Sequence, residues 1–72
     1  MKISAVIEHD DAGYYAYCPE LPGCQTQGDD IDEVMVNIQE AVELYLDTLD
    51  VHERKELLSK NIMTTQLEIK VA

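Results

Sequence analysis

The feature that most constrains the fold is a run of apolar residues at helical spacing between residues 31 and 49. The members of this stripe are Ile31, Val34, Ile38, Ala41, Val42, Tyr45, Leu46 and Leu49. Recurrence every three or four residues places them along one side of an α-helix, and that side must be buried against another element. Asp30 is the expected N-cap, with Glu33 at the spacing of a capping box. The sequence therefore predicts one long helix over residues 31–49, about 28 Å in length at 1.5 Å per residue.

The segment before this helix shows the two-residue period of β-strands. Residues 2–9 alternate between apolar and polar side chains, and residues 14–18 resume the alternation after a short turn-forming run that ends at Gly13. Two strands joined by so short a connection form a hairpin. Residues 24–27 are predicted to be a short third strand, which follows a loop stiffened by two prolines.

Two segments follow the helix. Residues 50–61 are polar around a pair of leucines, and they are compatible with either a short helical turn or a loop. Residues 64–71 alternate cleanly, with Leu67, Ile69 and Val71 on one side. This last segment is predicted to be a fourth, half-buried strand.

These elements predict an α+β domain. The chain has 72 residues, which suits a single domain spanning residues 1–72. The expected architecture has two layers in the order β-β-β-α-β, with a mostly antiparallel sheet and one long helix on one of its faces. The other face would bring Val6, Tyr15 and Tyr17 close together, which is a large aromatic surface for a small domain.

The charge of the chain limits its partners. The formal net charge is −10, from 15 acidic residues against 5 basic ones. The basic residues are scattered and form no cluster that could neutralise phosphates, so direct binding of nucleic acid is not expected. A charge of this size and sign steers basic partners toward a protein. The acidic residues on the outer side of the predicted helix are open to two interpretations, a solvated face or a surface kept for a basic partner.

No motif points to a membrane segment, a metal site or catalysis. Nothing near Met1 resembles a signal peptide, and no stretch approaches the roughly 20 apolar residues that span a bilayer. We therefore expect a cytoplasmic protein in which Cys18 and Cys24 are reduced thiols. Their spacing does not match that of zinc ligands, and neither His9 nor His52 is placed as a base for a thiol nucleophile. Acidic loop residues could hold Mg²⁺ for nuclease chemistry, but turn formation and helix capping account for them. We expect no metal, no other cofactor and no enzymatic activity.

Several motifs in a fixed order resemble those of the HicB-like antitoxin family. The most characteristic stretch is CPELPGC at residues 18–24, followed by TQGD at residues 26–29 and by NIQEAVELYL at residues 37–46 within the predicted helix. The first and last predicted strands fit the same pattern. The resemblance therefore covers nearly the whole chain.

The resemblance implies a degenerate ribonuclease-H-like domain that neutralises a small basic toxin, a HicA-like ribonuclease that cleaves mRNA. It implies inhibition by occlusion, in which an acidic surface covers the basic RNA-binding face and the catalytic histidine of the toxin. Many family members also carry a C-terminal DNA-binding domain, for which no residues follow the predicted fourth strand. The chain thus resembles a short form, and we expect no promoter binding unless another protein supplies the DNA contact.

The residues expected to contact a partner are Tyr15, Tyr17, Glu20, Leu21 and Pro22. Tyrosines are aromatic anchors of the kind that dominate interfaces, and the stiff loop would present Leu21 at little cost in ordering. The same residues are also compatible with the interface of a homodimer or higher homo-oligomer. The alternative function is therefore a solitary homo-oligomeric protein of this family with no toxin partner.

Overall fold

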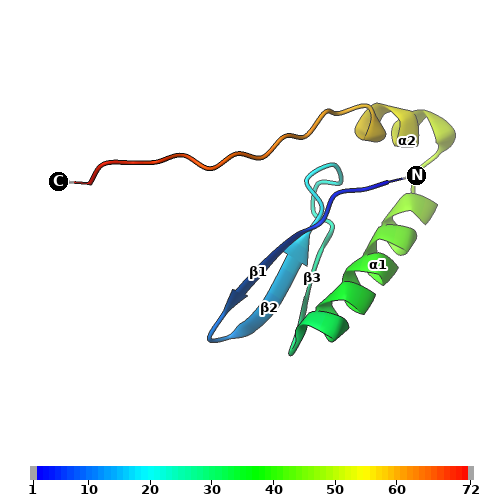
Figure 1. The fold of residues 1–72 in the computed structure, drawn as a ribbon. Coiled ribbons are helices and arrows are strands. Elements are labelled where there is room, and N and C mark those ends of the chain that lie inside the picture. The colour runs from blue at the N-terminus through cyan, green and yellow to red at the C-terminus, as the bar shows by residue number, and fades with distance from the viewer. Residues whose placement is uncertain (1, 72) are drawn as a thin grey trace.

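The computed structural model describes residues 2–71, so the two terminal residues of the predicted domain 1–72 lie outside it. The elements along the chain are β1 (Val6–Asp10), β2 (Gly13–Tyr17), β3 (Gln25–Gly28), α1 (Ile31–Asp47) and α2 (Val51–Leu58). The strands form one antiparallel sheet in the order β1-β2-β3. Helix α1 packs on one face of this sheet (Figure 1). The predicted α+β class, with a long helix on one face of an antiparallel sheet, is confirmed.

Two glycines allow the tight connections that hold this arrangement. In the turn between β1 and β2, Ala12 N donates a hydrogen bond to the Asp10 carboxylate at 2.8 Å, and Gly13 has a φ of 126°, which residues with a side chain rarely adopt. Gly28 ends β3 against the start of α1. A Cβ atom at Gly28 would lie 2.8 Å from the backbone nitrogen of Val34, so only glycine lets β3 and α1 approach this closely.

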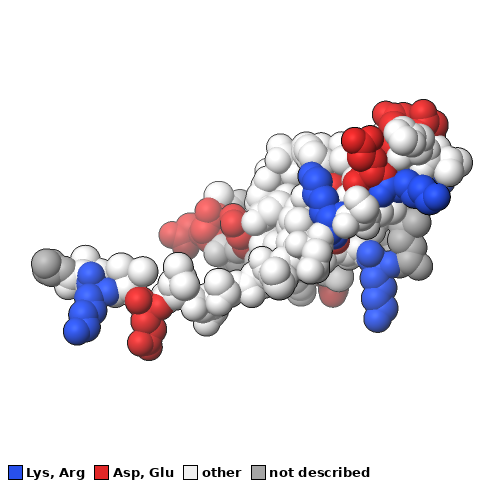
Figure 2. All heavy atoms as spheres, turned by 90° about the horizontal axis from the view of Figure 1, so that it is seen from above, with Lys and Arg blue, Asp and Glu red and all other residues white. Residues whose placement is uncertain are grey.

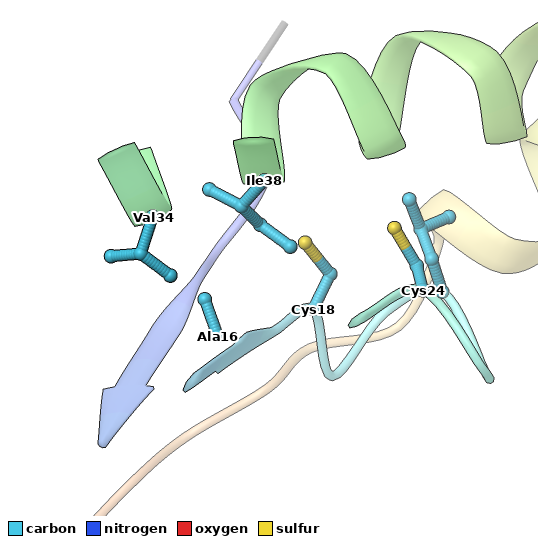
Figure 3. Close-up of a cluster of buried hydrophobic side chains, with 6 residues drawn as sticks. Ala16, Cys18, Cys24, Val34 and Ile38 are labelled. Atoms are coloured by element: carbon cyan, nitrogen blue, oxygen red, sulfur yellow. The ribbon is translucent and has the colours of Figure 1, made fainter. Parts of the chain in front are cut away.

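The core lies between the sheet and α1. Its buried apolar residues are Ala16, Cys18, Leu21, Cys24, Val34 and Ile38, and Figure 3 shows the two cysteine side chains directed toward the helix. Val34 and Ile38 belong to the predicted apolar stripe, whereas Cys18, Leu21 and Cys24 come from the loop between β2 and β3. This loop therefore supplies half of the core and is part of the packed body.

The predicted start of α1 is confirmed, but the helix ends earlier than predicted. The Asp30 side chain accepts a hydrogen bond from Glu33 N at 2.8 Å, which satisfies one free N–H of the first turn. The helix ends at Asp47, two residues before the predicted end. The next two backbone N–H groups bond to carbonyls only three residues earlier, at 3.1 Å. Such bonds tighten the last turn and end the α-helix.

The sequence was compatible with either a short helical turn or a loop over residues 50–61. In the structure, residues 51–58 form helix α2. Its start has a complete capping box: Glu53 N donates to the Asp50 carboxylate at 2.8 Å, and Asp50 N donates to the Glu53 carboxylate at 3.1 Å. Arg54 Nε donates to the Leu46 carbonyl at 3.0 Å. This bond fastens α2 to the end of α1.

Residues 64–71 do not form the predicted fourth strand, so the order is β-β-β-α-α rather than β-β-β-α-β. The segment runs away from the sheet (Figure 1), and Leu67, Ile69 and Val71 are 75%, 72% and 90% exposed. Alternation predicts an apolar strand face, but a strand forms only beside a neighbouring strand, and no described segment pairs with this one. For the same reason β1 begins at Val6, later than predicted. The ribonuclease-H-like domain that the family resemblance implies includes a fourth strand. Because residues 64–71 do not form it, the ribonuclease-H-like fold stays a prediction.

Candidate functional site

The loop between β2 and β3 consists of two consecutive β-turns. Leu21 N donates to the Cys18 carbonyl at 3.1 Å, and Cys24 N donates to the Leu21 carbonyl at 3.0 Å. A proline occupies the second position of each turn, and Gly23, at the third position of the second turn, has the positive φ of 82° that a type II turn requires. A further bond of 3.1 Å from Cys18 N to the Cys24 carbonyl closes the base of the loop. The loop is therefore held in one conformation by local geometry.

Leu21 lies where the two turns meet, and its side chain is 0% exposed. The Tyr45 hydroxyl of α1 donates to the Pro22 carbonyl at 2.8 Å and holds the second turn against the helix. The expectation that this loop presents Leu21 to a partner is therefore not met, because burying a leucine in so small a core stabilises the fold. Leu21 anchors the loop, and Pro22 and Gly23 are its exposed residues.

Glu20 is also turned inward and is 8% exposed. Ser4 N donates to its Oε2 atom at 3.0 Å, while Oε1 has no hydrogen-bond partner among residues 2–71. Burial disfavours the charged carboxylate, but the backbone N–H groups of Ser4 and of Glu20 itself outweigh burial and hold the pKa of Glu20 below its ordinary value. This carboxylate ties the N-terminal segment to the loop.

Tyr15 and Tyr17 lie on the face of the sheet that is turned away from α1. The register places Glu8 opposite Tyr15 and Val6 opposite Tyr17, while Ala16 between the tyrosines is buried toward the helix. The two tyrosine rings are 5.9 Å apart between centroids, and both residues are half-buried. The predicted grouping of Val6 with the two tyrosines on this second face is confirmed.

Strand β3 adds two glutamines to the same face, neither of which is among the contact residues predicted from the sequence. Gln25 lies opposite Tyr17 and Gln27 opposite Tyr15, and the Tyr15 hydroxyl donates to Gln25 Oε1 at 2.8 Å. A shallow hollow of about 380 Å³ is lined by Tyr15, Gln25, Thr26 and Gln27. The two-residue period of the third strand was the signal that could have identified these glutamines. We call the surface formed by Val6, Glu8, Tyr15, Tyr17, Gln25 and Gln27 the tyrosine face.

The acidic side chains are almost without ionic partners. Within residues 2–71, the only contact at ion-pair distance joins His52 Nε2 to Glu56 Oε2, at 3.9 Å and between exposed side chains. Figure 2 shows acidic side chains on separate parts of the surface seen from above. Because no lysine or arginine in this range offsets a carboxylate at close distance, the negative field of the chain reaches solvent largely uncompensated.

The cysteines belong to the core. Both are free and buried. Burial, together with the neighbouring Cys24 and Glu20, raises the pKa of the Cys18 thiol from 9.0 to about 11, so the thiol stays protonated and weakly nucleophilic near neutral pH. Residues 2–71 contain no cluster of three or more His, Cys, Asp or Glu side chains suited to a metal ion. No helix in the same range is long and apolar enough to cross a membrane.

Comparison with known proteins gives consistent matches. The family described as HicB_like antitoxin of bacterial toxin-antitoxin system matches residues 3–69. A UPF0150 protein of Helicobacter pylori (strain J99) is 46% identical over 72 residues, which cover 100% of both chains. A UPF0150 protein of Archaeoglobus fulgidus is 52% identical over 48 residues, 65% of this chain and 70% of the relative. Another, from Synechocystis sp., is 41% identical over 61 residues, 85% of this chain and 76% of the relative. No solved structure gives a significant match.

Proposed function

The chain belongs to the HicB-like antitoxin family of bacterial toxin–antitoxin systems, and we propose that it binds and occludes a small basic toxin that cleaves mRNA. The proposed partner is a HicA-like ribonuclease, which the antitoxin covers so that RNA cannot reach the toxin's active site. One observation carries this proposal: a net charge of −10 whose carboxylates have no lysine or arginine partner within residues 2–71.

The charge supports occlusion of an RNA-binding surface in particular. A ribonuclease binds its substrate largely through lysine and arginine side chains that neutralise phosphates. An acidic protein competes for the same cationic groups, and its long-range field accelerates the encounter with the toxin. Both effects weaken with added salt, because ions screen exposed charges over about 10 Å at 0.1 M.

The tyrosine face is the proposed contact surface. Tyr15 and Tyr17 would lie over cationic side chains of the toxin, since the face of an aromatic ring attracts a cation. Glu8, opposite Tyr15 in the register, would supply a carboxylate to the same cations. Pro22 is exposed on the neighbouring loop and would extend the contact, while Glu20 and Leu21 would contribute by holding that loop in place.

We further propose that the protein acts in the cytoplasm without catalysis or a cofactor. The Cys18 thiol is kept protonated by burial, and one oxygen of the Glu20 carboxylate is bound by Ser4 N. A protonated thiol is not the nucleophilic form of cysteine, and a carboxylate whose pKa is lowered is a weak general base. Binding alone accounts for the proposed activity.

The test begins with a pull-down of the tagged protein from its native lysate at low and moderate salt, followed by purification of any small basic protein recovered. That protein is then assayed for RNA cleavage in the presence of increasing antitoxin. We expect cleavage to be suppressed near equimolar antitoxin. Undiminished cleavage in a large excess of antitoxin would refute the proposal.

A double variant tests the contact surface. Replacing Tyr15 and Tyr17 by alanine is expected to raise the inhibitory concentration more than about tenfold, which corresponds to a loss of at least ~1.4 kcal/mol. Leu44→Ala is the matched control, because Leu44 is 68% exposed on α1, away from the tyrosine face. Equal inhibition by the double variant and the control would show that another surface binds the toxin.

A second candidate function is that of a solitary homo-oligomeric protein without a toxin. The exposed apolar side chains of Leu67, Ile69 and Val71 favour self-association. Recovery of the protein alone, at both salt concentrations, would support this second candidate.

A further inference from the structure

The C-terminal part of the chain presents an apolar strand face without a partner. Residues 59–71, here called the tail, leave the body of the protein as an extended segment (Figures 1 and 2). Four of its apolar side chains are spaced by two or four residues, which places them on one side of an extended chain, and are 72% to 90% exposed; these are Met63, Leu67, Ile69 and Val71. Apolar side chains exposed at this spacing are typical of a strand whose neighbour is missing.

The sheet offers a place for such a strand at its β1 edge. β1 pairs with β2 only, whereas at β3 the Gln27 carbonyl already accepts a hydrogen bond of 2.9 Å from Asn37 Nδ2. Between α1 and the segment that leads into β1 runs an open groove of about 360 Å³, lined mainly by apolar side chains that include Ile3, Met35 and Val42. A strand added beside β1 with its apolar side toward α1 would fill this groove.

We propose that the tail of one copy of the chain pairs with the β1 edge of a second copy, with Leu67, Ile69 and Val71 in the groove beside α1. The tail extends away from its own β1 (Figure 1), and the chain measures 49 × 29 × 18 Å along its principal axes. The tail is therefore placed to reach a neighbouring molecule. Reciprocal exchange around a two-fold axis gives both tails a neighbouring strand and both β1 edges a partner.

The distribution of charge favours the same pairing. The tail carries a net charge of +1, from Lys60 and Lys70 against Glu68, and the rest of the chain carries −11. The positive tail suits an acidic body and offsets part of the repulsion between two bodies. Its own body and that of another copy carry the same charge, so the choice of another copy rests on the direction of the tail (Figure 1). With its apolar side toward α1, the tail turns both Glu68 and Lys70 toward the outer face of the sheet. On that face β1 carries Glu8 and Asp10.

This inference does not rest on the proposed binding of a toxin. Pairing uses the β1 edge and the groove on the helix side of the sheet, so the ring faces of Tyr15 and Tyr17 on the opposite side stay available, and Glu8 is the one side chain that both proposals use. Failure of the exchange would leave the toxin-binding proposal unchanged, and failure of toxin binding would leave the exchange unchanged.

Analytical ultracentrifugation of the full chain tests the assembly. The wild type is expected to sediment with twice the 8.2 kDa mass of one chain. Leu67→Ser combined with Ile69→Ser is expected to raise the dimer dissociation constant on the order of 100-fold, because two apolar side chains lose their buried site. Gln66→Ser combined with Glu68→Ser alters the other side of the same segment and should leave a dimer. A monomeric wild type, or a dimer unaffected by the first variant, would overturn the proposal.

Cross-linking distinguishes exchange between copies from folding back within one copy. One chain carries Glu8→Cys, and a second chain carries either Gln66→Cys or Lys70→Cys; the native Cys18 and Cys24 are buried. Disulfide-linked pairs of the two different chains are expected after mixing under mild oxidation. Cross-links that form only within a single chain bearing both cysteines would show that the tail covers its own β1. That result, or the absence of any cross-link, would overturn the exchange.

Discussion

Truncating Leu21 to alanine tests whether the double-turn loop is part of the core. The side chain is 0% exposed at the junction of the two turns, so the substitution removes buried methyl groups and leaves a cavity. Such changes cost about 2–5 kcal/mol. A chain of 72 residues has a total free energy of unfolding of about 4–11 kcal/mol. With a slope of about 1 kcal/mol/M for a domain this small, the urea midpoint should fall by about 2 M or more.

The matched control is Leu44→Ala, the same chemical change at a position that is 68% exposed on α1. Its free energy of unfolding should stay within about 0.5 kcal/mol of the wild type. Urea unfolding followed by circular dichroism measures both variants at one protein concentration. The cysteines at the base of the loop give a second readout, since they should react faster with a thiol reagent in Leu21→Ala. If the two leucine variants lose equal stability, the loop does not contribute to the core as the structure indicates.

Three further predictions concern the glycine contact, the helix cap and the thiol. Gly28→Ala should lower the free energy of unfolding by about 1–3 kcal/mol, because the new Cβ would lie 2.8 Å from Val34 N; an unchanged thermal midpoint would contradict this close approach. Asp50→Ala should cost about 1 kcal/mol in thermal unfolding by removing the capping box with Glu53, and the conservative Asp50→Asn should recover most of it. The pKa of Cys18 is raised from 9.0 to about 11, so its contribution to stability is complete below pH 9 and is lost as the pH rises from 9 to 11. Cys18→Ala should therefore weaken the pH dependence of the urea midpoint over that interval. An unaltered pH dependence would show that other groups cause it.

The sequence predicted which way the site's side chains point in the strands, where a two-residue period applies. It did not predict this in the loop, where the chain turns. A two-residue period assigns Tyr15 and Tyr17 to one face of the sheet, and the register confirms that face. Leu21 lies in a loop with two prolines, where no period relates sequence position to direction. Its burial follows from two specific turns and from the Tyr45 hydroxyl that holds them against α1. An exposed Leu21 in a surface loop was therefore expected, whereas the structure buries Leu21 in the core.

The sequence by itself determined the elements whose causes are local. The apolar stripe and the Asp30 cap specify where α1 begins, and the turn before Gly13 specifies the hairpin, because each depends on residues only a few positions apart. Tertiary structure alone decided the inward direction of Leu21 and the position of residues 64–71. These outcomes depend on contacts between segments far apart in the chain. For residues 64–71 the alternation specifies an apolar side, but a strand also needs a neighbour, which the single chain does not provide.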